Sequence, residues 1–567
     1  MRSFLPPRTR RSPLGPALLA AILLAWASPA GAVPPDVAEQ RDATLQRVLE
    51  TARATGALEP GPVTMAGRTA APPRLEPMKS PERRPASPPV TTDWSPYGGP
   101  FGYDQAAHLL HRATIGARFD EISAAVDRGL SAEIDLLLTP RLPPPPPGAW
   151  ATEPFPDVSD WTQEMIDSLI TVYRERGERL RMWWLEAIVE EPDVAVTEAM
   201  TLFWHDHFAT AMSDVTLPQS MYIQNRLFRT HATGSFRDLV DAICVDPAML
   251  IWLDGNQNRV GDVNENFARE LLELFTLGLD QYTQEDVVAA SRAFTGYATF
   301  DGVTSVFVPE WHDYGMKTFL GQEGPWYGPD IVEILFEQEE TARFLVRKLY
   351  RWFVDEHPDE ALVEDLAQTL RQNDYEIAPV LERIFASEHF FDPEYRGSVF
   401  CDGIDRSAGL VRALGIGGTD FQDLEGGPAV WALYAMVIQG HILFEPPNVA
   451  GWPGYRSWLN TYTMPWRKTL DVGLIDGEVS GFDIGMQADV MALAATWRDP
   501  NDPYQLIDDV ALHFFGMEPT ELVRQRMLDE LLQGAEPWEW NLGIPEAEDR
   551  IQGLLRLAMR LPDFQLK

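Results

Sequence analysis

The chain has 567 residues, 45% of them hydrophobic, so it can form one large or two closely associated domains with a substantial core. Its formal net charge is −39 at pH 7, from 85 acidic and 46 basic residues. Such a surface repels phosphate backbones and anionic lipids, so nucleic acid is excluded as an expected partner. The only cysteines, Cys244 and Cys401, exclude a disulfide-rich scaffold and a zinc–thiolate site. They leave either one disulfide or two buried free thiols.

The N-terminus has the pattern of an export signal. Arg10 and Arg11 precede an apolar run over 14–26 and a small-residue cleavage site at 30–32. This pattern predicts a signal peptide over 1–32, since the apolar run is too short for a stable membrane span. We therefore expect a periplasmic or extracellular protein. The paired arginines leave the twin-arginine route open beside the general secretory route.

The signal is followed by a proline-rich segment and then by a long helical region. Residues 33–102 predict a largely disordered linker, with one short helix over 36–55. Residues 103–567 predict a single large helical domain. Helical periodicity predicts helices over 104–113, 119–138, 161–189, 197–212, 218–232, 236–244, 264–279, 284–294, 330–336, 339–353, 361–373, 377–387, 399–414, 429–440, 492–497, 503–514, 520–532 and 546–558.

Strand patterns are few and short. Residues 297–320 carry β-branched and aromatic residues punctuated by glycines, which predicts a small β-hairpin or an irregular lid. Residues 445–464 are rich in Pro, Gly and Trp and predict a long non-helical loop. No later run is long and apolar enough to span a bilayer. The predicted fold class is therefore mainly α, a large multi-helix domain.

The helix expected over 264–279 has a marked polar face. Asn264 is a suitable N-cap and Gly278 a suitable stop. Residues three and four apart share a helix face, so Asn266, Glu270 and Glu273 should form a row. Two interpretations stay open: a solvated face, in which Arg269 pairs with a neighbouring glutamate, or a carboxylate row that lines a cleft.

Two histidine-bearing segments could contribute to such a cleft. His205, Asp206 and His207 lie among aromatic residues, which lower the local dielectric and shift imidazole pKa values. Residues i and i+2 of a regular helix lie about 200° apart, so one ion could not bind both histidines unless the helix breaks. His312 and Asp313 lie on a glycine-flexed loop, where an acid–base role and a turn cap are alternatives.

The loop over 444–454 is rigid and rich in proline and glycine. Trp452 and Trp458 flank Arg456 within or just after this loop. Two indole rings in such a loop can form a stacking platform for sugars or peptides, or they can fill a core.

Several of these segments, taken together and in this order, resemble a known family. The matching segments are 107–116, 203–208, 264–278, 282–287, 312–321 and 446–454. The chain is similar to the exported bacterial family of unknown function numbered eighteen hundred (DUF eighteen-hundred). That resemblance implies an exported, mostly helical protein that often occurs with a second exported, sulfatase-like protein, and it supplies no reaction. His111 and Asp206 depart from the Arg and Asn commoner in the family.

Two functions of different class follow. The first is a hydrolase with an acid–base or metal-assisted site that uses a divalent metal ion. Its expected catalytic residues are His207, Glu270, His312 and Asp313. Its expected substrate-binding residues are Trp204, Asn266, Arg269, Lys317 and Trp452. Its expected metal ligands are His205 and His207. The second is a non-catalytic binding or scaffold protein that acts with an exported partner, in which the His/Glu cluster is a structural polar network.

Overall fold

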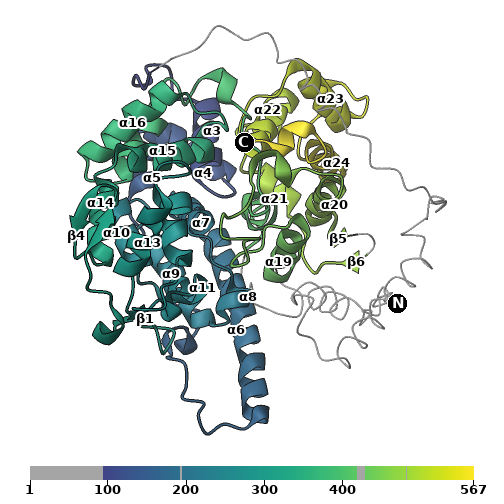
Figure 1. Cartoon of the computed structure of the whole chain (residues 1–567). Coiled ribbons are helices and arrows are strands. Elements are labelled where there is room, and N and C mark those ends of the chain that lie inside the picture. The colour runs from purple at the N-terminus through teal and green to yellow at the C-terminus, as the bar shows by residue number, and fades with distance from the viewer. Residues whose placement is uncertain (1–92, 192–193, 418–427, 480–481) are drawn as a thin grey trace, which may run out of the picture. The chain divides into compact units, whose positions relative to one another are not determined.

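The computed structural model describes residues 93–567 except 192–193, 418–427 and 480–481 (Figure 1). The predicted signal peptide, the predicted helix over 36–55 and most of the predicted linker lie outside these residues. The contacts of the chain divide it into two units, one of which comprises Val90–Ser480 and Ile484–Lys567. Every helix named below belongs to this unit, whereas residues 481–483 belong to the other.

The end of the predicted linker packs against the helices. The side chain of Trp94 is buried, and its indole N–H donates to the carbonyl of Leu362 at 3.0 Å. The backbone N–H of Tyr97 donates to the carbonyl of Ala386 at 2.7 Å. The packed structure therefore begins before Tyr103, because the buried indole of Trp94 anchors this segment to the helices.

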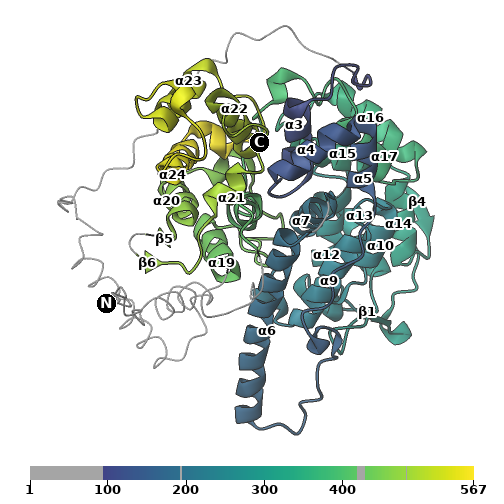
Figure 2. The same ribbon diagram turned by 180° about the vertical axis from the view of Figure 1, so that it is seen from behind.

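The structure is mainly α-helical, as predicted. The first half of the described chain contains α3 (Tyr103–Ala113), α4 (Phe119–Arg128), α5 (Leu130–Leu138), α6 (Gln163–Val189), α7 (Thr197–His207), α8 (Met212–Val215), α9 (Pro218–Thr230), α10 (Phe236–Ile243), α11 (Pro247–Trp252), α12 (Asn266–Glu270) and α13 (Gln284–Ala293). The second half contains α14 (Gly328–Phe336), α15 (Glu339–Phe353), α16 (Glu360–Gln372), α17 (Ala378–Phe385), α18 (Leu410–Ala413), α19 (Pro428–Gln439), α20 (Thr463–Asp476), α21 (Val490–Ala494), α22 (Pro503–Phe515), α23 (Glu521–Leu532) and α24 (Ala547–Ala558). The N-terminal half of α6 extends beyond the neighbouring helices in both views (Figure 2).

Three of the predicted helices are irregular. The helix expected over 399–414 is a π-helix, η6 (Asp405–Gly409), followed by α18. The helix expected over 119–138 is divided at Gly129, whose φ of 82° ends α4. The helix expected over 264–279 begins as α12 and continues as a π-helix, η3 (Leu271–Thr276). Since a π-turn takes one more residue than an α-turn, the expected row of Asn266, Glu270 and Glu273 does not follow α-helical spacing along its whole length.

The strands are short and pair locally. β1 (Tyr297–Ala298) pairs with β2 (Val306–Phe307), and β3 (Lys317–Phe319) pairs with β4 (Gln322–Gly324), both antiparallel. Two further two-residue strands are β5 (Glu478–Val479) and β6 (Phe482–Asp483). The predicted small β-hairpin over 297–320 is thus confirmed.

An aromatic core surrounds the C-terminal end of α7. Trp204 stacks on Phe236 with ring centroids 5.6 Å apart, and Phe208 contacts Phe275 at 5.1 Å. Both cysteines are free and buried. In the described ranges, no helix combines the length and the apolar character that crossing a bilayer requires.

Candidate functional site

His205 lies on the face of α7 that meets the tryptophan-containing loop. Its Nε2 accepts the backbone N–H of Phe444 at 3.0 Å, and its ring lies 5.4 Å from that of Trp452. Only 1% of the residue is exposed, and burial lowers the pKa of His205 to about 3. The imidazole is therefore neutral and already holds a hydrogen-bond partner.

His207 points to a different neighbour, as the helical geometry predicts for residues two apart. Its Nε2 donates to the carbonyl of Phe275 at 3.0 Å, and its Nδ1 accepts from Nζ of Lys348 at 3.0 Å. Burial, with Lys348 as a second cause, lowers the pKa of His207 well below its ordinary value. Both ring nitrogens are occupied, and no group of three or more His, Cys, Asp or Glu side chains that could hold a metal ion occurs in the described part of the chain.

The loop that carries His312 is bonded internally. His312 Nδ1 donates to the carbonyl of Thr295 at 2.9 Å, and the ring stacks on Tyr327. Asp313 pairs with Arg292 at 2.7 Å, and this hydrogen-bonded ion pair lowers the pKa of Asp313 to about 2. Lys317 Nζ donates to the carbonyls of residues 313 and 315. The expected acid–base group and its neighbours thus bond to one another and to the main chain of their own region.

The expected polar helix face is partly solvated. Arg269 pairs with Glu265 at 2.9 Å, and Asn266 is exposed. Burial and the charge of Glu273 raise the pKa of Glu270, which is half-buried. Among the described residues, no hydrogen bond, ion pair or ring contact joins Glu270 to His207 or His312.

The motif histidines share one property: each bonds to a main-chain group of a distant segment. His108 Nε2 donates to the carbonyl of Phe390 at 3.0 Å. His111 Nε2 donates to the carbonyl of His513 at 3.1 Å. Trp204, an expected substrate-binding residue, also donates its indole N–H to a main-chain carbonyl, at 3.3 Å. These side chains join separate segments of the helical body.

The tryptophan-containing loop is held against α7. The carboxylate Oδ1 of Asp206 accepts the backbone N–H of Trp452 at 2.7 Å. Gly451 has a φ of 82°, and a Cβ there would collide with the side chain and carbonyl of Asp206. The loop therefore needs glycine at this position for its backbone conformation and for its approach to the helix.

We expect Gly451→Ala to lower the free energy of unfolding by about 2–4 kcal/mol, because a left-handed backbone and a collision are combined. Urea unfolding followed by circular dichroism measures the change. Gly534 is a matched control: its φ is 86°, but a Cβ there meets nothing within 4 Å. Gly534→Ala should cost about 1 kcal/mol. Equal losses in the two variants would contradict the close approach to Asp206.

A pocket of about 450 Å³ lies beside this loop. Its walls are Gln439, Gly440, Pro447, Asn448, Ala450, Gly451, Trp452, Pro453, Ser457 and Trp458. The expected substrate-binding residue Trp452 is therefore in the wall of a cavity. We call this cavity the tryptophan pocket.

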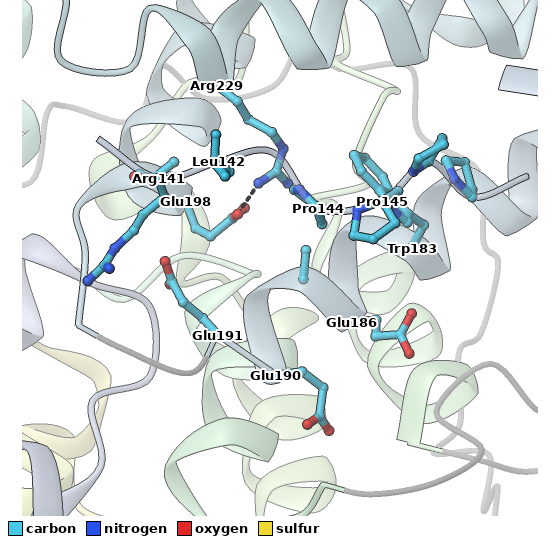
Figure 3. Close-up of a pocket in the computed structure, with 14 residues that line it drawn as sticks. Arg141, Leu142, Pro144, Pro145, Trp183, Glu186, Glu190, Glu191, Glu198 and Arg229 are labelled. Atoms are coloured by element: carbon cyan, nitrogen blue, oxygen red, sulfur yellow. Dashed lines mark hydrogen bonds and ion pairs between the residues drawn. The ribbon is translucent and has the colours of Figure 1, made fainter. Parts of the chain in front are cut away.

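A larger pocket, of about 560 Å³, lies where the polyproline run meets α6 and α7 (Figure 3). Its walls are Arg141, Leu142, Pro144, Pro145, Pro146, Pro147, Trp183, Glu186, Ala187, Glu190, Glu191, Thr197, Glu198 and Arg229. Trp183 fixes the proline run by donating its indole N–H to the carbonyl of Pro145 at 2.7 Å. We call this cavity the proline–glutamate pocket.

A buried ion pair forms one side of the proline–glutamate pocket. Glu198 pairs with Nη1 of Arg229 and accepts the indole N–H of Trp184 at 2.9 Å. Arg229 Nε donates to Asn225 at 2.8 Å, and its buried Nη2 has no protein partner. The Glu191 side chain points toward this pair, whereas Glu190 points away (Figure 3). Burial and the charge of Glu198 raise the pKa of Glu191 well above its ordinary value.

The spacing of residues after Trp183 is an indication of this pocket in the sequence. Glu186 and Ala187 lie three and four residues after Trp183 and so share one side of α6, and Glu190 and Glu191 follow directly after its last residue. The proline run provides the opposite wall. The contact between these segments cannot be derived from either segment alone.

The comparisons with known proteins identify a family and give no reaction. No curated protein and no solved structure matches the chain. A family model described as "Protein of unknown function (DUF1800)" matches residues 108–566. This match spans most of the chain, and the protein belongs to that family.

Proposed function

We propose that this protein is a non-catalytic binding protein that holds a peptide segment of a partner in the proline–glutamate pocket. The observation that carries the proposal is the bonding of the motif histidines. His108, His111, His205, His207 and His312 each bond a main-chain group. Bonds of this kind stabilise the fold, and they occupy both ring nitrogens of His207. Nε2 of His312 has no protein partner, but it is buried, away from any ligand in solution.

The chemistry of the proline–glutamate pocket supports a peptide as its ligand. Prolines and Trp183 provide an apolar wall for side chains. The accessible carboxyl of Glu191 can bond an amide N–H, and Arg229 Nη2, unpartnered in the wall, can donate to a carbonyl. An amide carries both groups, so an extended peptide suits this pair.

The proposal includes the cellular setting. The basic and apolar N-terminal pattern supports export to the periplasm or beyond, and the acidic surface supports a protein partner over nucleic acid. The family's frequent companion, a second exported sulfatase-like protein, is the first partner to test. The same N-terminal segment is compatible with both the general secretory and the twin-arginine route.

Panning the purified protein with a phage-displayed random peptide library tests the ligand class. We expect enriched peptides whose affinity falls about tenfold or more in Leu142→Asp, since a charge at the rim opposes apolar contact. Leu142 is 94% exposed, so folding should be unaffected. Leu522→Asp, at a leucine that is 72% exposed on α23, is the matched control and should bind as wild type. The proposal would be contradicted if no peptides are enriched, or if the enriched peptides bind Leu142→Asp with the same affinity as wild type.

A hydrolase is the second candidate, on one specific observation. Burial and the charge of Glu198 raise the pKa of Glu191 well above its ordinary value beside the ion-paired carboxylate of Glu198, and such a difference between neighbouring carboxyls suits general acid catalysis. Incubation of the enriched peptides distinguishes the two functions. Cleavage by wild type that is lost in Glu191→Gln would assign the pocket to a hydrolase.

A further inference from the structure

The tryptophan pocket carries a second binding site, independent of the proline–glutamate pocket. Every one of its ten wall residues is uncharged, although the whole chain has a net charge of −39. A neutral wall in so acidic a protein excludes ions as the preferred ligand, because a bound charge would lose its hydration without gaining a counter-ion.

The aromatic side chains are presented as fixed surfaces. Trp452 and Trp458 are 7% and 8% exposed, and the ring of His441 contacts both at 4.6 Å. The Asp206 carboxylate holds the backbone of Trp452, and Trp458 lies at the end of η7 (Tyr455–Trp458). Because these indoles are already packed, a ligand that stacks on them meets a rigid surface and orders few side chains on binding.

The wall also contains polar atoms that lack a protein partner. Nε1 of Trp452 is a buried donor without an acceptor, and Oε1 of Gln439 is a buried acceptor without a donor. Leaving such a group unpaired costs about 1–3 kcal/mol. A hydroxyl group donates and accepts at once, so a ligand with several hydroxyls can satisfy both kinds of atom.

Small residues form part of the wall beside the tryptophans. Gly440, Ala450 and Gly451 bring no long side chains into the pocket, while the ring of His441 packs against both indoles. The volume of about 450 Å³ is in the range of small-molecule sites. From the neutral wall, the indoles and the unpaired donor and acceptor, we infer that the tryptophan pocket binds a neutral oligosaccharide.

Saturation-transfer difference NMR on the purified full chain tests this inference. The probes are β-1,4-linked tetrasaccharides of glucose and of N-acetylglucosamine, with tetragalacturonate as an acidic sugar and a proline-rich decapeptide as the competing class. At concentrations up to about 10 mM, at least one neutral probe should bind with a Kd in the millimolar range or tighter. Binding should fall about tenfold in Trp452→Phe, which retains a ring but lacks the indole N–H.

A second variant, which fills the pocket without changing Trp452, separates loss of sugar binding from loss of folding in Trp452→Phe. Ala450→Arg places a long side chain in the pocket from an exposed position, and it should abolish sugar binding. Ala361→Arg, at an exposed alanine of α16, makes the same change in charge and should bind as wild type. The inference is overturned if no neutral probe binds, if tetragalacturonate binds equally, if only the decapeptide binds, or if Ala450→Arg binds as wild type.

Discussion

Replacement of Glu198 by alanine is expected to lower the free energy of unfolding by about 3–5 kcal/mol, because the change leaves a buried guanidinium without its counter-charge. The side chains of Arg229 and Glu198 are 1% and 6% exposed. The variant also deprives the Trp184 indole N–H of its acceptor. Guanidinium chloride unfolding measures the loss.

The control for this prediction is an exposed ion pair. Arg237 and Glu333 lie 3.5 Å apart with side chains 36% and 65% exposed. Glu333→Ala should therefore cost less than about 1 kcal/mol. If Glu198→Ala is no more damaging than Glu333→Ala, the pair is not the structural support of the proline–glutamate pocket described above.

Acidification should destabilise the wild-type protein through His205, and His205→Gln should remove that contribution. The folded pKa of His205 is about 3, whereas the unfolded imidazole titrates near 6.5. Below pH 6.5 the imidazole of His205 therefore binds a proton in the unfolded chain and stays neutral in the folded chain. The contribution of His205 to the free energy of unfolding is complete above pH 6.5. It falls by about 1.4 kcal/mol per pH unit below that, and the total loss reaches about 5 kcal/mol near pH 3.

Glutamine can accept the backbone N–H of Phe444 but binds no proton in this range. Between pH 6 and pH 4, the unfolding free energy of His205→Gln should thus fall less steeply than that of wild type, by about 1.4 kcal/mol per unit. Urea unfolding at each pH gives both slopes. His357→Gln, at a ring that is 65% exposed, should follow wild type. Parallel slopes for His205→Gln and wild type would show that His205 is not held neutral by burial.

The helical architecture was predictable because its periodicity is local. Phe267, Leu271 and Leu274 recur along one predicted stripe; Phe267 and Leu271 are buried, whereas Leu274 is only partly buried and Phe275, beside the stripe, is fully buried. The π-turn over Leu271–Thr276 was not predictable, since an inserted residue leaves the sequence pattern nearly unchanged. Patterns along the chain thus report which residues are apolar and not how the backbone accommodates them.

The candidate site was predictable only in part. The sequence selected segments that do meet: His205 bonds Phe444, and Asp206 bonds Trp452. It could not show that these contacts satisfy the imidazole and carboxylate groups, because hydrogen-bond partners come from residues more than 200 positions away. The pairing of Glu198 with Arg229, 31 positions apart, is also hidden from the sequence, since neither residue lies in a recognisable motif.

The contacts of His207 and Lys348 also determine how one helix ends. The last carbonyls of any helix lack intrahelical partners, and a positive charge there interacts favourably with the negative end of the macrodipole. Phe275 supplies one such carbonyl to His207, and Leu274 supplies the preceding one to the ammonium group of Lys348. The two side chains therefore act as a C-terminal cap delivered by two other helices, so the polar segment around His207 should limit fraying at the end of its neighbour.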